Sequence, residues 1–370
     1  MKLVREAKKQ ILSGLKTGKV VIIYGARQVG KTTLVKQILS ETSDSLYLNG
    51  DEPDVREALE GKTSAEMFAF FRGAKLVAID EAQRIKDIGL SLKLLHDSYP
   101  ELTIIATGSS SFDLANAASE PLTGRNYTVT MYPATWLEFA NAAGSLQSKR
   151  LLEERILYGM YPAVISAADA QTEVKDLARD YLFKDVLQVE QVRRPVILEK
   201  LTQLLAWQIG NLVSYNEIAQ KLQISRQTVI SYVNMLEKAF ILFRLPSLGN
   251  KPRSEVTRFE KIYFYDTGIR NALIGDFSPM EFRYDKGMLF ENFFIAERVK
   301  SYRRHKESIN PHFWRTKDGS EIDLVERRGS TLSAFECKWS DSKIHTRAWN
   351  NAYPDVLVQR VGKDNAIDFF

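Results

Sequence analysis

Short apolar runs alternate with amphipathic stretches along the first part of the chain. The runs are rich in branched side chains, and their length favours buried strands over helices. They occupy residues 20–24, 46–49, 76–79, 102–106 and 127–131. The stretches between them, such as 89–98, have the spacing of helices. This alternation predicts a doubly wound, mostly parallel α/β sheet.

The pattern becomes helical beyond this sheet. Leu, Ile and Tyr recur at helical intervals from residue 151 to 185. Two short helices are then predicted at 217–222 and 226–238, and strand patterns follow at 240–245 and 261–266. This order is typical of a helix-turn-helix followed by a two-stranded wing.

The second helix of this pair has an apolar face and a polar start. Val229, Val233 and Leu236 share the face that we expect to be buried. The polar residues near the start are Arg226, Gln227, Thr228 and Ser231. The loop between the two predicted strands is basic, with Lys251, Arg253 and Arg258. A polar helix start can enter a DNA major groove, but folds of this shape also serve as protein-contact modules, so both readings stay open.

The first predicted strand leads directly into a phosphate-binding loop. The loop residues are Gly25, Ala26, Arg27, Gln28, Val29, Gly30, Lys31 and Thr32, with Thr33 following them in a predicted helix. A strand, a glycine-rich loop and a helix in this order direct backbone N–H groups at one anion. Lys31 can neutralise the β- and γ-phosphates of ATP, and the Thr32 hydroxyl can bind Mg²⁺.

Two acidic residues follow the third apolar run. Asp80 is expected at the carboxyl end of the buried strand, where it can hold Mg²⁺, and Glu81 can orient the attacking water. The alternative is that both acids only begin the next helix. The phosphate-binding loop upstream favours the catalytic reading.

Further polar residues follow the next strand. Thr107 and Ser109 come directly after the run 102–106 and are candidates for contact with the γ-phosphate or the lytic water. Gln83 is a weaker candidate for the same place, and the serines can also serve as a helix cap. Arg125 precedes the last predicted strand and is a candidate arginine finger for a neighbouring copy, or a residue in a local salt bridge.

A spaced set of acids occupies the C-terminal region. Glu291 lies on a predicted helix at 288–300, Asp323 on a strand, and Glu336 on the next strand with Lys338. Side chains two residues apart on a strand share a face, and the turn at 327–330 makes the two strands neighbours. The three carboxylates could therefore hold Mg²⁺ beside Lys338, or form charged pairs on the surface of a β-hairpin.

Composition narrows the class of protein. The chain has 370 residues, of which 44% are hydrophobic and 26% charged, as in globular rather than disordered proteins. We expect no membrane association, because no apolar stretch approaches the roughly 20 residues of a membrane span and the first residues lack a signal-peptide core. A single cysteine, Cys337, agrees with a reducing cytoplasm. The net charge of +5 permits nucleic-acid binding without requiring it.

Ten motifs together resemble a family of prokaryotic AAA-type ATPases. Those in the first half are GARQVGKTT at 25–33, AIDEAQ at 78–83, TGSSS at 107–111, LTGR at 122–125 and YPATWLEF at 132–139. Those in the second half are YGMYPAV at 158–164, FYDTGIRNALIG at 264–275, GMLFENFFIAE at 287–297, WRTKDGSEIDLV at 314–325 and AFECK at 334–338. The resemblance implies a C-terminal region of long-unknown function that is similar to a winged helix and a PD-(D/E)xK nuclease. It also strengthens the interpretation of Glu291, Asp323, Glu336 and Lys338 as a metal site.

We therefore expect three modules. They are a P-loop AAA-type ATPase at 1–145, a helical and winged-helix segment at 146–278, and a small α/β nuclease-like domain at 279–370. The leading hypothesis is a homo-oligomeric ATPase, with a hexameric ring as one arrangement, that uses ATP and Mg²⁺ to bind and remodel branched or broken DNA in repair or defence. The alternatives are a nucleotide-controlled switch that binds protein partners or an operator, and a Mg²⁺-dependent endonuclease coupled to the ATPase.

Overall fold

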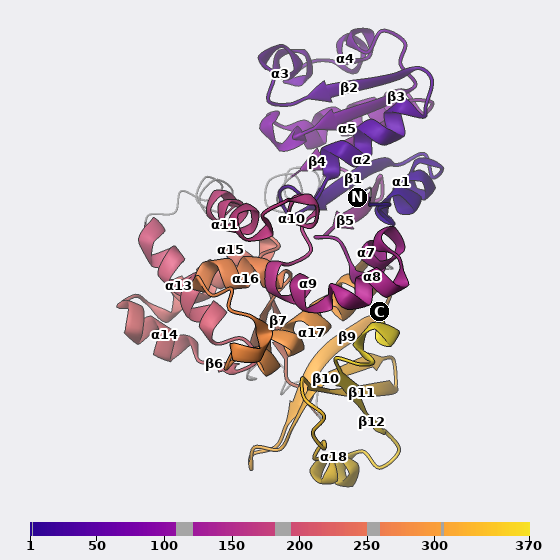
Figure 1. Ribbon diagram of the computed structural model, residues 1–370. Helices are drawn as coiled ribbons and strands as arrows, with labels where there is room; N and C mark the ends of the chain where they lie inside the picture. Colours follow the sequence, from indigo (N-terminus) through magenta and orange to yellow (C-terminus); the bar gives the residue numbers. More distant parts are fainter. Residues whose placement is uncertain (2, 109–120, 182–193, 250–259, 305–306) are drawn as a thin grey trace.

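The first module is a five-stranded sheet with helices on both faces. The computed structural model describes residues 1, 3–108, 121–181, 194–249, 260–304 and 307–370 (Figure 1). The strands are β1 (Val20–Gly25), β2 (Ser45–Asn49), β3 (Leu76–Asp80), β4 (Thr103–Gly108) and β5 (Asn126–Met131). All neighbours pair in parallel in the order β2-β3-β4-β1-β5. The expected parallel α/β sheet is confirmed, and β4 separates β1 from β3.

Two apolar clusters cover the two faces of this sheet. The helices are α1 (Ala7–Leu15), α2 (Lys31–Ser40), α3 (Pro53–Leu59), α4 (Ser64–Phe70), the short η1 (Ala82–Arg84) and α5 (Ile88–Ser98). Side chains of α1 and α2 pack with Val21 and Ile23, whereas α3, α4 and α5 pack with Val20 and Ile22. Successive strand residues point to opposite faces, so the continuous apolar run of β1 follows from burial on both sides.

A helical segment follows the sheet. Its helices are α7 (Trp136–Ala143), α8 (Ser145–Arg150), α9 (Leu152–Tyr158), α10 (Pro162–Ser166), α11 (Ala170–Tyr181) and α13 (Pro195–Trp207). Thr135 begins α7 with a capping box, in which its hydroxyl accepts from the Glu138 N–H and the Glu138 carboxylate accepts from the Thr135 N–H. Among the described residues, no helix combines the length and apolar character needed to cross a membrane.

The predicted helix pair and its two strands are present. The elements are β6 (Leu212–Val213), α14 (Tyr215–Leu222), α15 (Arg226–Lys238), β7 (Leu242–Pro246) and β8 (Glu260–Phe264), and the strands form an antiparallel sheet in the order β6-β8-β7. Val229, Val233 and Leu236 are fully buried, as expected. The strands are displaced by one or two residues from their predicted ranges, and α14 begins two residues earlier. The basic residues Lys251, Arg253 and Arg258 lie outside the described residues.

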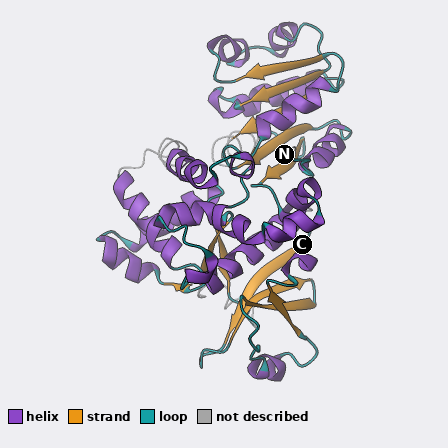
Figure 2. Cartoon of the chain, in the orientation of Figure 1, coloured by secondary structure: helices purple, strands orange, loops and turns teal. Residues whose placement is uncertain are grey.

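The last module packs a long helix on a four-stranded sheet (Figure 2). It contains α17 (Lys286–Arg304), β9 (Ile309–Arg315), β10 (Glu321–Arg328), β11 (Thr331–Lys338), α18 (Arg347–Ala352), β12 (Val358–Gly362) and η5 (Ala366–Phe369), and it follows α16 (Thr267–Ile274) and η4 (Met280–Phe282). The strand order is β12-β11-β10-β9, with β12 parallel to β11 and the other pairs antiparallel. Helix α17 is longer than the predicted 288–300.

The modules share one apolar core and polar contacts. On α17, Lys300 Nζ donates to the Ala134 carbonyl at 3.1 Å, and a Glu297 carboxylate oxygen accepts from the Trp136 N–H at 2.8 Å. Ala134 and Trp136 follow β5 of the first module and are far from α17 in the sequence. Helix α17 is therefore anchored directly to the first module.

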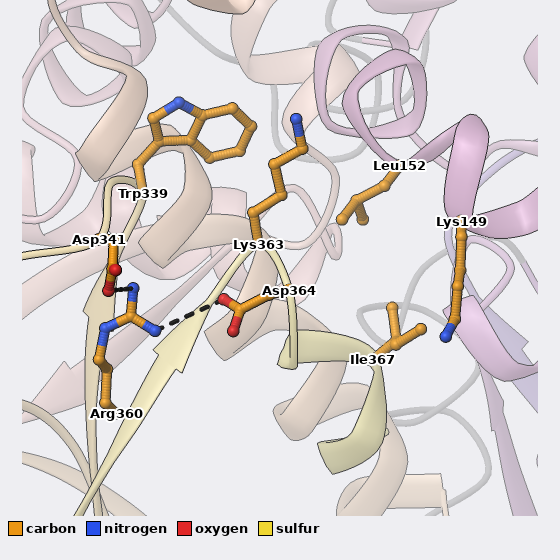
Figure 3. Close-up of a pocket in the computed structure, with 8 residues that line it drawn as sticks. All are labelled: Lys149, Leu152, Trp339, Asp341, Arg360, Lys363, Asp364 and Ile367. Carbon is orange, nitrogen blue, oxygen red and sulfur yellow. Dashed lines mark hydrogen bonds and ion pairs between the residues drawn. The ribbon is translucent and has the colours of Figure 1, made fainter.

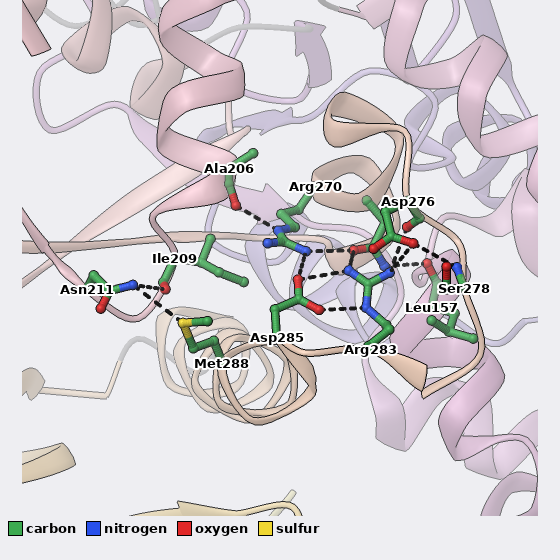
Figure 4. A network of polar contacts seen from close by, with 11 residues as sticks. Leu157, Ala206, Ile209, Asn211, Arg270, Asp276, Ser278, Arg283, Asp285 and Met288 are labelled. Carbon is green, nitrogen blue, oxygen red and sulfur yellow. Dashed lines mark hydrogen bonds and ion pairs between the residues drawn. The ribbon is translucent and has the colours of Figure 1, made fainter. Parts of the chain in front are cut away.

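A buried cluster of charges joins the helices around α16 (Figure 4). Asp285 lies between two arginines, with its oxygens 2.6 Å from Arg270 Nη1 and 2.8 Å from Arg283 Nε. Arg270 also donates to the Ala206 carbonyl of α13 at 2.8 Å, and Arg283 donates to the Asp276 carbonyl at 2.8 Å. Arg270 belongs to the FYDTGIRNALIG motif at 264–275, so this motif contributes one of the charges of the buried cluster.

Candidate nucleotide-binding site

The phosphate-binding loop connects the carboxyl end of β1 to the start of α2. Gly30 precedes α2 in a left-handed conformation, with φ at 92°. At Gly25, φ is 153°, and an added Cβ would lie only 2.0 Å from the Met131 carbonyl oxygen of β5. Only glycine permits both features, because other residues would carry a Cβ into the backbone or into strain. The sequence motif is therefore a requirement of the local geometry.

Lys31 lies folded over this loop. Its side chain is buried, and Nζ donates to the Gly25 carbonyl at 2.9 Å and to the Ala26 carbonyl at 2.8 Å. These two neutral carbonyl oxygens hold the ammonium group against the loop. A phosphate anion would offer it stronger, charge-assisted hydrogen bonds.

Asp80 is the centre of a hydroxyl cluster at the end of β3. Thr32 Oγ1 and the Tyr47 hydroxyl each donate to Asp80 Oδ2 at 2.7 Å, and Thr107 Oγ1 donates to Oδ1. Burial and this hydrogen bond raise the pKa of Tyr47, so the phenol stays a donor at neutral pH. The adjacent Thr32 hydroxyl and Asp80 carboxylate are hard oxygen ligands and fit Mg²⁺, which binds few protein groups beside phosphates.

Glu81 follows in a left-handed conformation, with φ at 49°. Its N–H donates to Thr107 Oγ1 at 3.2 Å, and its carboxylate accepts from Gln83 Nε2 at 2.5 Å. Gly50 packs directly beneath it, because an added Cβ there would lie 2.5 Å from the Glu81 carbonyl oxygen. Thr107 thus contacts both acids of the site, and Ser109 lies outside the described residues.

Arg125 lies at the amino ends of the strands, opposite the phosphate-binding loop. Its carbonyl accepts from the Val20 N–H at 3.0 Å, at the start of β1, whereas the phosphate-binding loop follows the end of that strand. Its half-exposed side chain pairs with Asp97 at 2.7 Å. Arg125 is therefore separated from the loop of its own chain by the length of β1. The arginine-finger role in a neighbouring copy stays a prediction.

A cavity of about 280 Å³ adjoins the loop and was not anticipated from the sequence. Its walls include Val29, Thr33 and Leu34 from the loop and α2, Leu3 from the N-terminal segment, and Pro162 from α10. Arg5 also lines it, and its guanidinium donates to the Val29 and Tyr132 carbonyls. A largely apolar cavity beside a phosphate loop suits a nucleotide base. Local motifs gave no signal for it, because its walls are distant in the sequence.

Two of the C-terminal acids lie close together across β10 and β11. The Asp323 N–H donates to Glu336 Oε2 at 3.4 Å, the Cys337 N–H donates to Asp323 Oδ2 at 2.8 Å, and Lys338 pairs with Glu336 at 2.8 Å. Lys261 of β8 pairs with Glu291 and Glu321. Within the described ranges, no three His, Cys, Asp or Glu residues are grouped so that they could hold a metal ion. The metal-site role of Glu291, Asp323 and Glu336 stays a prediction.

A second cavity, of about 550 Å³, lies between the helical segment and the C-terminal sheet (Figure 3). Arg360 pairs there with Asp341 at 3.2 Å and Asp364 at 3.5 Å. Lys363 pairs with Glu153 of α9 and lies 5.5 Å from the centre of the Trp339 ring. Two of its cations, Arg360 and Lys363, are thus paired with acids, and Lys149 of α8 also lines the cavity.

Three families match successive parts of the chain. Residues 17–140 match the AAA domain family, and residues 149–279 and 286–360 match two domains of unknown function, DUF8612 and DUF4143. An uncharacterized protein of Mycobacterium tuberculosis is 28% identical over 96% of this chain and 78% of its own length. An uncharacterized protein of Methanocaldococcus jannaschii is 28% identical over 69% of this chain and 62% of its own length.

A solved structure has a similar arrangement. It is a Walker-type ATPase of Pyrococcus abyssi that is 17% identical, with a TM-score of 0.50 over 74% of this chain and 96% of the other. At that identity the likeness shows the fold alone. Residues 17–140 thus combine a match to the AAA domain family with the parallel sheet of a P-loop ATPase fold, and the matches to two domains of unknown function follow them.

Proposed function

We propose that this protein binds and hydrolyses ATP and uses the reaction to change how its later modules bind DNA. The carrying observation is that Lys31, Thr32, Asp80, Glu81 and Thr107 meet at one edge of the sheet. These five residues are the polar groups that phosphoryl transfer to water requires. Branched or broken DNA, in repair or defence, is the proposed substrate.

Each side chain has a distinct part in the proposed reaction. Lys31 would exchange its loop carbonyls for the β- and γ-phosphates of bound ATP, and Thr32 with Asp80 would hold a Mg²⁺ ion that supplies charge neutralisation at those phosphates. Glu81 orients the attacking water. Thr107 donates to Asp80 and accepts from the Glu81 backbone, so it fixes the distance between the metal ligand and the water-orienting acid. Gln83 holds the Glu81 carboxylate in place.

The proposed base cavity supports coupling between ATP and the later modules. Its Pro162 wall belongs to α10, so a bound base would touch both the ATPase domain and the helical segment. Just before α10, the Met160 N–H donates to an Asp266 oxygen at 2.6 Å, and the Leu157 carbonyl accepts from Asn271 at 2.8 Å. Asp266 and Asn271 belong to the α16 region. Occupancy of the cavity is thus linked by direct contacts to the packing of the C-terminal half.

The start of α15 supports DNA as the partner. Arg226, Gln227 and Ser231 are exposed there, while Ser225 caps the helix by accepting from the Thr228 N–H at 3.0 Å. An exposed polar helix start behind a rigid apolar face is the arrangement with which helix-turn-helix proteins read a major groove. In this proposal, α14 and α15 form the DNA-binding part of a winged helix.

Two assays test the proposal separately. ATP turnover should be measured alone and with single-stranded, duplex and four-way-junction DNA, and Lys31→Ala should abolish it. Arg226→Ala should weaken DNA binding about tenfold without changing basal turnover. The matched control is Arg179→Ala, which removes an exposed arginine on α11 that is paired with Asp176. Turnover that no DNA alters, together with unchanged DNA binding in Arg226→Ala, would favour a nucleotide switch that acts on protein partners.

A further inference from the structure

A lysine occupies the middle of the C-terminal acidic cluster. Lys261 lies on β8, in the sheet beside α15, and its side chain is 1% exposed. Its Nζ is 3.3 Å from Glu291 Oε1 on α17 and forms an ion pair with Glu321 at the start of β10. The cluster therefore contains a cation that belongs to the protein itself and comes from a different module.

The oxygens around this lysine already have donors. Glu291 Oε1 also accepts from the Tyr263 hydroxyl, and Asp323 Oδ2 accepts from the Cys337 N–H at 2.8 Å. Glu336 accepts from Lys338 at 2.8 Å and from the Asp323 N–H at 3.4 Å. A divalent cation repels an ammonium group that lies against one of its ligands. The position of Lys261 beside Glu291 therefore favours the lysine over a divalent ion.

The charges in the cluster also favour a lysine over a divalent ion. The carboxylates of Glu291 and Glu321 both pair with the ammonium group of Lys261, whose side chain is 1% exposed. Buried carboxylates are costly unless a cation pairs with them, and a lysine supplies a compact point charge with three donors.

We infer that Lys261 is the resident cation of this cluster. Its ammonium group pairs with Glu291, one of the three candidate metal ligands, and with Glu321, so the C-terminal module does not cut DNA by metal-assisted hydrolysis. The cluster instead fastens β8 to α17 and β10, and it locks the sheet beside α15 to the C-terminal sheet. The nuclease-like fold then serves as a docking and binding module. This inference does not depend on ATP hydrolysis.

Manganese binding to the nucleotide-free full chain tests the inference. The wild type should bind no Mn²⁺ at this cluster, by calorimetry and by electron paramagnetic resonance of the bound ion. Lys261→Ala should gain one Mn²⁺ per chain at this cluster, because it leaves buried carboxylates without a cation. Adding Asp323→Asn to Lys261→Ala should remove the gained ion, which separates it from Mn²⁺ at the ATP site.

Two controls keep the test decisive. Lys261→Arg retains the charge and should bind no added Mn²⁺, and Lys317→Ala removes an exposed lysine of the same module and should behave as the wild type. The inference is overturned if the wild type binds Mn²⁺ and Asp323→Asn alone abolishes that binding. It is also overturned if Lys261→Ala is folded by circular dichroism and gains no ion. If Lys261→Ala does not fold, the wild-type titration decides.

Discussion

Replacing Asp285 by asparagine removes the acid that two buried arginines share. The side chains of Arg270 and Arg283 are fully buried, and that of Asp285 is 1% exposed. Asparagine keeps the size of the side chain but removes its charge, so Arg270 loses the acid with which it pairs and Arg283 keeps only its pair with Asp276, at 3.3 Å. Breaking a buried ion pair by removing one partner costs about 3–5 kcal/mol. We expect Asp285→Asn to lose at least that lower value in free energy of unfolding.

The pH dependence of this loss has a defined sign. Burial would raise the pKa of Asp285, but the hydrogen bonds and charges of Arg283 and Arg270 outweigh it and lower that pKa. The stabilisation is therefore present above the ordinary carboxyl pKa of about 4 and is lost as pH falls through the lower folded value. The difference in free energy of unfolding between Asp285→Asn and the wild type should become smaller under acid conditions.

Urea unfolding followed by far-ultraviolet circular dichroism measures this loss at pH 7 and below pH 4. The matched control is Glu307→Gln, which breaks the exposed pair with Arg328 and should cost at most about 1 kcal/mol. A loss for Asp285→Asn no larger than that of the control would refute the reasoning. It would mean that the buried charges around α16 contribute little to stability.

Three further predictions concern the nucleotide site and the cysteine. Lys31→Ala should weaken ATP binding by at least about tenfold, as measured by fluorescent-nucleotide titration. Glu81→Gln should bind ATP normally but stall hydrolysis, as measured by phosphate release. Normal turnover in both variants would overturn the site assignment. Arg125→Ala should lower turnover, and mixing it with Lys31→Ala chains should restore part of the activity if the arginine acts in a neighbouring copy; no restoration would contradict that role. Burial and the neighbouring carboxylates raise the pKa of the Cys337 thiol, so it should resist a thiol reagent at pH 8 until urea unfolds the chain, and rapid labelling of the native protein would contradict its placement.

The grouping of the candidate nucleotide-site residues was largely predictable because its signals are local. A strand, a glycine-rich loop and a helix fix Lys31 and Thr32 within a few residues, and a buried strand ending in acids places Asp80 at the same edge of a parallel sheet. Thr107 was found because β4 ends beside β3. Tyr47 was missed, since a tyrosine in a strand usually packs in a core and only the pairing of β2 with β3 brings its hydroxyl to Asp80.

The remaining features depend on contacts between distant segments. The cavity beside the loop joins Leu3 to Pro162, and no periodicity relates positions so far apart. Lys261 appeared in the sequence only as the start of a wing strand, yet its neighbours lie on α17 and β10. Sequence spacing could bring Asp323 and Glu336 together, but it could not reveal that Lys261, from another module, pairs with Glu291 and Glu321.

In the proposed function, ATP turnover is coupled to DNA binding through the helical segment. This coupling can be tested by the DNA affinity of the Glu81→Gln variant without nucleotide and with saturating ATP, using a fluorescent four-way junction and a duplex of the same sequence. We expect ATP to change the affinity for at least one of these DNAs by about fivefold or more, as for typical coupling between sites, and we expect Lys31→Ala to show no such change. Equal affinities with and without ATP in a variant that demonstrably binds ATP would contradict it.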